Sequence, residues 1–198
     1  MGPFIPSITL TDPNKITSPI LESTVYSEIG DEVPGVLGKA MTSRGRLVKV
    51  WKANPDNQLY DKYFCHGHSL GTYRRHGYSV FSGKDILAAL EDDCDEIGVF
   101  HPPWEVMKLL IAGDIISFSN LEQGIIHTVV VVNVPWYAGF LGARQTKKDT
   151  LNEIMVASKK GTNLECVKYL SSVRFTYSCA QIIRFWRARR HTFWQTWV

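Results

Sequence analysis

The chain lacks several features that would mark a membrane, secreted or nucleic-acid-binding protein. Its longest apolar run, Ile125 to Val134, is interrupted by His127 and Asn133 and is far shorter than the roughly 20 residues that a membrane helix needs. Met1 to Thr11 contains two prolines and no basic stretch, so we expect no signal peptide. A net charge of +3 over 198 residues is too small to indicate nucleic acid as a partner. We therefore expect no transmembrane segment, and a protein that is cytoplasmic in the producing cell or leaves it by a route independent of a signal peptide.

Cysteines are few, and none of them is paired at the short spacing typical of metal sites. Because no signal peptide is expected, the sequence favours free thiols over disulfides. The chain also contains no internal repeat and no low-complexity tract, and its length suits one globular domain with an extension. The four cysteines are Cys65, Cys94, Cys166 and Cys179.

The first 60 residues have the character of short strands and turns. Ile8–Leu10 and Leu47–Trp51 are predicted strands, and the second follows a basic turn at Ser43–Arg46. We expect residues 1–60 to form a β-rich extension and residues 61–198 to form the main domain.

Helices are predicted next. Cys65–Thr72 is compatible with a short helix, and Ser82–Asp85 resembles a capping start, with an acid three residues after the serine. Apolar residues then follow at helical spacing until the acidic run Glu91–Asp93, which we expect to lead out of the helix. Trp104–Leu110 is a further predicted short helix, ended by Gly113.

From Asp114 onward the pattern is that of β-strands. A hairpin is predicted from Ile115–Phe118 and Ile125–Val134, with later strands at Ile154–Ala157 and Ile182–Trp186. Helices followed by an antiparallel sheet indicate the α+β class.

An ordered set of motifs resembles the NlpC-type branch of papain-like cysteine peptidases and amidases. The set comprises Cys65-His66-Gly67, Phe81–Asp85, Gly113-Asp114 and His127-Thr128, followed by the segments Met155–Gly161 and Phe185–Arg189. The resemblance covers about residues 63–190. It implies a papain-like fold in which helices pack on an antiparallel sheet, and a cysteine hydrolase that cleaves an amide or peptide bond without a cofactor. Two positions depart from the pattern, since His68 stands where an aromatic residue is usual and Ala157 where an acid is usual.

The resemblance implies that Cys65 is the nucleophile and His127 the general base. A thiol at a helix start can be activated by the helix dipole and by a neighbouring imidazole. Backbone N–H groups there, with His66, Gly67 and His68 around them, would bind the substrate and its oxyanion.

A third group should orient the imidazole of His127. Ser158 and Asn152 are both open for this role. Asn133 has the right strand parity but lies about 20 Å from His127 along an extended strand, which is too far.

The implied substrate is a cell-wall peptide or a protein. Related folds also serve as delivered bacterial toxins, which leaves an immunity or inhibitor protein open as a partner. Oligomeric state is not readable from the sequence.

Two other classes remain open. One is a catalytically inactive papain-like binding module, which the missing acid at Ala157 favours. The other is a structural zinc protein that uses Cys65 with His66 or His68, Cys94 and His101, although their spacing fits no finger pattern and we expect no metal. Cys94 itself lies among acids, which disfavours its thiolate and makes it a poor nucleophile.

Arginine and aromatic residues alternate in the tail, Arg184 to Val198. Such a pattern fits either an interfacial patch or a closing strand whose aromatic residues cover the sheet while its arginines lie outside.

Overall fold

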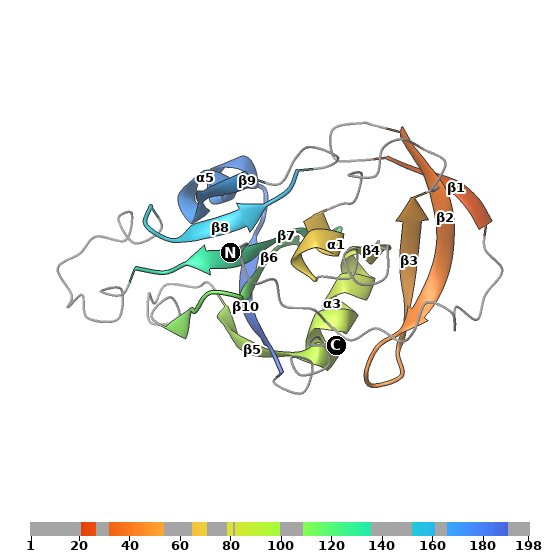
Figure 1. Ribbon diagram of the computed structural model, residues 1–198, viewed down its shortest axis with the longest axis horizontal. Coiled ribbons are helices and arrows are strands. Elements are labelled where there is room, and N and C mark those ends of the chain that lie inside the picture. Colours follow the sequence, from red (N-terminus) through yellow and green to blue (C-terminus); the bar gives the residue numbers. More distant parts are fainter. Residues whose placement is uncertain are drawn as a thin grey trace, which may run out of the picture.

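The computed structural model describes residues 21–26, 32–53, 65–70, 79–80, 82–99, 109–135, 152–160 and 166–189 (Figure 1). These residues form two antiparallel sheets and three helices, so the predicted α+β class is correct. No helix within these ranges is both long and apolar enough to cross a membrane.

The smaller sheet has four strands in chain order. It begins with two long hairpins, and its last strand comes from the chain after the first helix. The predicted strand at Leu47–Trp51 is confirmed, whereas Ile8–Leu10 lies outside the described residues. The strands are β1 (Leu21–Tyr26), β2 (Glu32–Met41), β3 (Leu47–Ala53) and β4 (Ser79–Val80).

The larger sheet has six strands in the order β5-β10-β6-β7-β8-β9. The predicted hairpin is present as β6 and β7, and the two later predicted strands are β8 and β10. β10 is the last of the described strands along the chain but lies inside the sheet, between β5 and β6. The strands are β5 (Cys94–Val99), β6 (Ile115–Asn120), β7 (Gly124–Asn133), β8 (Met155–Ser158), β9 (Cys166–Tyr169) and β10 (Ile182–Ala188).

Three helices accompany the sheets: α1 (Cys65–Ser69), α3 (Gly83–Asp93) and α5 (Leu170–Thr176). α3 begins as predicted, because the Ser82 side chain accepts a hydrogen bond from the backbone N–H of Asp85. The predicted helix at Trp104–Leu110 lies mostly outside the described residues.

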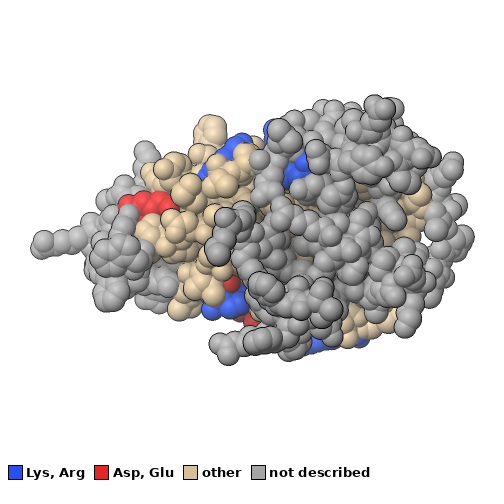
Figure 2. All heavy atoms as spheres, in the orientation of Figure 1, with Lys and Arg blue, Asp and Glu red and all other residues tan. Residues whose placement is uncertain are grey.

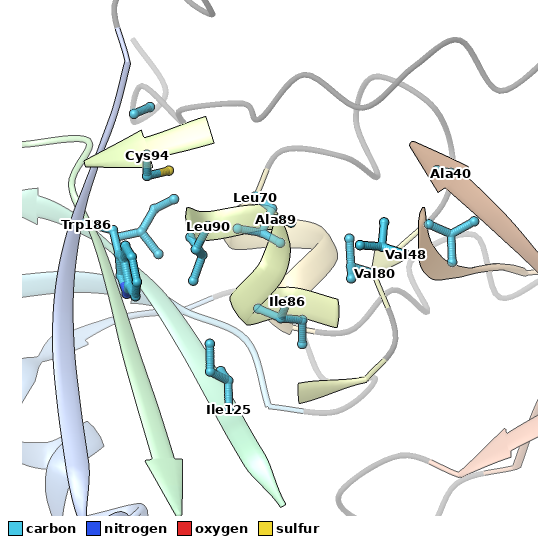
Figure 3. Packing of buried hydrophobic residues seen from close by; sticks show 13 residues of the cluster. Ala40, Val48, Leu70, Val80, Ile86, Ala89, Leu90, Cys94, Ile125 and Trp186 are labelled. Atoms are coloured by element: carbon cyan, nitrogen blue, oxygen red, sulfur yellow. The ribbon is translucent and has the colours of Figure 1, made fainter. Parts of the chain in front are cut away.

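One hydrophobic core joins the two sheets through α3 (Figure 3). Val48 and Val80 reach α3 from the small sheet, while Ile125 and Trp186 reach it from the large sheet. The α1–α3 side of the large sheet is therefore buried under a layer shared with the small sheet. The boundary expected near residue 60 lies outside the described residues, but β4 from the second segment pairs with β3 from the first.

A second core lies on the opposite face of the large sheet. Phe118, Val129 and Phe185 point into it from the strands, and Leu170 and Val173 cover it from α5. Because the sheet is covered on both faces, its central strands are buried along most of their length.

The acidic run Glu91–Asp93 ends α3 instead of following it, which differs from the sequence-based expectation. Acidic side chains at a helix C-terminus interact unfavourably with the negative end of the helix dipole. Two arginines offset this repulsion. Arg46 donates to the Ala88 carbonyl and binds Asp92 in a bidentate pair, and Arg189 donates to the carbonyls of Glu91 and Asp92.

Candidate functional site

β7 carries His127 and contains an irregularity directly before it. In the pairing with β6, Phe118 lies opposite His127 and Ser119 lies opposite Ile125, so Ile126 is an extra residue on β7. Such a bulge changes the direction of the side chains that follow it. Ile125 therefore faces the core with α3, whereas His127 faces the core beneath α5.

His127 is fully buried, and one ring nitrogen has a polar partner on the next strand. Its Nε2 shares a 3.1 Å hydrogen bond with the Oγ of Ser158, the last residue of β8. Ser158 is one of the two residues that the sequence left open as the orienting group. The other, Asn152, is exposed in the turn before β8.

Ala157, where the resemblance would place an acid, pairs with Val130. Alternation along β8 directs it to the face opposite Ser158. An acid at this position would not share the face of His127.

Cys65 is the first residue of α1, as expected, and is only 1% exposed. The helix packs against β7 and is anchored there by its second residue. The Nδ1 of His66 shares a 2.9 Å hydrogen bond with the Oγ1 of Thr128, the residue after His127. Within the helix, the Ser69 hydroxyl donates to the Cys65 carbonyl at 2.9 Å.

The structure thus places the first turn of α1 beside the strand segment that carries His127. Strand alternation directs Thr128 and His127 to opposite faces of the sheet. His66 approaches from the face that α3 covers, and the His127 ring lies on the face of Ser158 and α5. The other residues expected near the thiol, Gly67 and His68, are both buried in α1.

Two aromatic rings beside His127 were not anticipated from the sequence. Tyr177, just after α5, stacks on the imidazole with ring centroids 4.0 Å apart and planes 11° apart. Phe118 lies 6.0 Å from His127 and 5.9 Å from Tyr177 in tilted arrangements. Phe118 could have been found from the hairpin register, but Tyr177 lies 50 residues further along and belongs to no recognisable motif.

Cys94 is buried at the junction of α3 and β5. Burial, together with the neighbouring Asp93 carboxylate, raises the pKa of its thiol above the ordinary value. This direction agrees with the sequence-based expectation and keeps the thiol protonated and unreactive at neutral pH.

Asp114 is held by hydrogen bonds to Arg187 and to the backbone of its own turn. Its carboxylate accepts two hydrogen bonds from Arg187 at 2.8 Å and one from the Ile111 backbone N–H at 2.8 Å. The preceding Gly113 has a φ of 97°, which favours glycine. Asp114 thereby holds the turn before β6 against β10.

Arg184 of β10 and Arg189, the residue just after it, pair with acids of β5. Arg184 lies 3.7 Å from Glu96, and Arg189 lies 2.9 Å from Asp95, both on β5. Phe185 and Trp186 between them are buried. The described part of the tail is therefore a strand with its aromatic residues in the cores, while residues 190–198 lie outside the description.

Within the described ranges, no three His, Cys, Asp or Glu side chains come together in a way that could hold a metal ion. Of the residues considered for zinc, His101 lies outside those ranges.

Figure 2 shows the charged side chains of the described residues in small groups of either sign on the face in view.

Comparisons with protein-family models, curated proteins and solved structures give no match to this chain.

Proposed function

We propose that this protein is a papain-like cysteine hydrolase that cleaves an amide or peptide bond through Cys65 and His127. The observation that carries the proposal is the buried 3.1 Å contact between Nε2 of His127 and Ser158. It holds the His127 imidazole in one orientation, as a cysteine hydrolase requires of its base, and the helix that begins with Cys65 packs against the same strand from the face opposite the ring.

In the proposed reaction, the Cys65 thiolate attacks the carbonyl carbon and forms a C–S bond, while the carbonyl electron pair moves to oxygen. The His127 imidazolium donates its proton to the leaving nitrogen as the C–N bond breaks. Water then attacks the thioester and gives its proton to His127. The C–S bond breaks, and an acid and the thiolate are released.

Thiolate formation in this mechanism depends mainly on the imidazole. α1 has only five residues, so its dipole is small compared with that of a long helix. His66 already uses its Nδ1 to hold α1 against Thr128, which makes it a structural contact more than a donor to an oxyanion.

The motif resemblance supports a peptide or amide substrate, either in cell-wall peptide or in a protein reached by delivery to another cell. An immunity or inhibitor protein would accompany the second setting.

The decisive experiment is site-resolved alkylation by iodoacetamide, read by mass spectrometry of cysteine-containing peptides. An ordinary thiol is only about 0.3% ionised at pH 6. We expect Cys65 to react at least tenfold faster at pH 6 than the exposed Cys179, and His127→Gln to remove that difference. Cys94 is as buried as Cys65, but the pKa of its thiol is raised, so it is the matched control and should stay unlabelled in the folded protein.

The matching activity assay compares wild type with Cys65→Ala on cell-wall peptides and on unfolded protein, and measures newly formed amines. If Cys65 is labelled no faster than Cys179 and Cys65→Ala keeps full hydrolysis, the proposed mechanism is wrong.

A second function, a catalytically inactive papain-like binding module, is favoured by two specific observations. Cys65 and His127 are 1% and 0% exposed, and the His127 ring lies with Ser158 and Tyr177, on the sheet face opposite the side chain of Thr128 that His66 contacts. In such a module Cys65 would titrate near the unperturbed thiol value of about 8.5 and would show no dependence on His127.

A further inference from the structure

Tyr177 lies against the face of the His127 ring in a defined position. Its centroid is 4.0 Å from that of the imidazole, with nearly parallel planes. Its backbone N–H donates to the Val173 carbonyl at 3.0 Å, which fixes it at the end of α5. α5 is in turn held to the sheet by Leu170 and Val173 in the second core. The position of the Tyr177 ring is therefore set by packed structure.

The stack has an electrostatic consequence because His127 is completely buried. Charging an imidazole away from water is unfavourable unless other groups replace its hydration. An aromatic face provides such a group, since its negative quadrupole attracts a cation within about 6 Å of the ring centroid. Ser158 contacts the edge of the imidazole at Nε2, whereas Tyr177 contacts its face, so the two residues restrain the ring from different directions.

Building on the cysteine-hydrolase function above, we propose that Tyr177 is a positioning residue that holds the His127 ring and stabilises its imidazolium form. The thiolate of Cys65 exists at neutral pH only while the imidazolium persists, so Tyr177 widens the pH range of the reactive pair toward the alkaline side. Its aromatic face performs this role, and its hydroxyl does not.

The test compares Tyr177→Leu, which keeps bulk but removes the aromatic face, with Tyr177→Phe, which keeps the face. Phe175→Leu is the matched control, because Phe175 lies in the last turn of α5, two residues before Tyr177, but is 86% exposed. Titration of the 13C-labelled His127 ring by NMR is the first measurement, with its signal assigned from the spectrum of His127→Gln.

We expect Tyr177→Leu to lower the ratio of imidazolium to imidazole at a given pH about three- to tenfold. The fast Cys65 alkylation should then be lost at lower pH than in wild type. Tyr177→Phe and Phe175→Leu should titrate and react as wild type does. An unchanged His127 titration in Tyr177→Leu overturns the role of Tyr177, and so does a loss in Tyr177→Phe equal to that in Tyr177→Leu.

The two proposals fail in different ways. A wild-type Cys65 that reacts like Cys179 removes the hydrolase function, and with it any catalytic use of the stack. A reactive wild-type Cys65 that is unaffected by Tyr177→Leu leaves the hydrolase intact and removes Tyr177 alone.

Discussion

His127 receives its neighbours from three separate parts of the chain. Phe118 lies opposite it in the hairpin, Ser158 comes from β8, and Tyr177 follows α5. The bulge at Ile126 turns the imidazole toward these neighbours and away from α3. A histidine in an unbroken strand of this parity would have pointed with Ile125 into the core shared with the small sheet.

At the residue scale, we predict that Ser158→Ala destabilises the protein. It leaves Nε2 of the buried His127 without the Ser158 oxygen, which typically costs about 1–3 kcal/mol. Urea unfolding at pH 7 measures the loss. Ser158→Thr keeps the oxygen on a residue suited to strands and should retain most of the stability. Equal losses in both variants would show that the contact contributes nothing.

α3 connects the two sheets and approaches β7 unusually closely at its first residue. A Cβ on Gly83 would lie 2.5 Å from the Gln123 carbonyl oxygen and 2.7 Å from the backbone N and O of Ile125. These are backbone atoms, so relief of the clash would move either α3 or the start of β7. Gly83 thereby sets the distance between α3 and the strand that carries His127.

We therefore predict that Gly83→Ala lowers the free energy of unfolding by about 1–3 kcal/mol, the usual range for overpacking. Lys84→Ala, one residue on and exposed, should change it by less than about 0.5 kcal/mol. Chemical denaturation of both variants decides the matter. A Gly83→Ala protein as stable as wild type would mean that α3 moves away from β7 at no cost.

β5 illustrates why an element can escape prediction. Its Asp95 and Glu96 resemble a solvated acidic loop, yet they belong to an edge strand paired with β10. Both acids form ion pairs with arginines of β10 or just beyond it. Charged residues on an edge strand also discourage pairing with other chains. The acidic residues that make β5 look like a loop in the sequence are complementary in charge to arginines about 90 residues away.

At the scale of the whole molecule, Asp92 joins the β2–β3 turn to the end of α3. The Arg46 guanidinium holds the pKa of the Asp92 carboxyl below its ordinary value, with burial opposing and the Thr42 hydroxyl assisting. A lowered pKa in the folded state stabilises the fold above the unfolded value of about 3.9. That contribution is lost as pH falls through the lower, folded value.

Asp92→Asn should accordingly cost about 1.5–3 kcal/mol at pH 7, the range for hydrogen bonds to charged groups. The difference from wild type should shrink below about pH 4, as the wild-type carboxyl becomes protonated. Thermal or urea unfolding between pH 3 and 7 measures both effects. Asp95→Asn, whose side chain is 70% exposed, should cost less than about 1 kcal/mol. A pH-independent deficit in Asp92→Asn would contradict the assignment.

The core shared by both sheets predicts that the described parts unfold together. Val48→Ala in β3 removes two buried methyl groups and should cost about 1.5–2.5 kcal/mol. Tryptophan fluorescence and far-UV circular dichroism should report one coincident transition, shifted equally by this substitution. Two separate transitions, with only the first affected, would show that the small sheet folds independently of the large one.

Local signals in the sequence were sufficient for the hairpin of β6 and β7, the capped start of α3, and the selection of Cys65, His127 and Ser158 as residues of interest. These features depend on strand alternation and on contacts a few residues apart, which any short window contains. Tertiary contacts alone established the acidic end of α3, the strand β5, the internal place of β10 and the ring of Tyr177 on His127. Each of these requires a partner many tens of residues away, such as Arg46 for Asp92 or β10 for β5. Burial and charge compensation between distant segments outweigh local preference. These features therefore cannot be predicted from a single stretch of the chain.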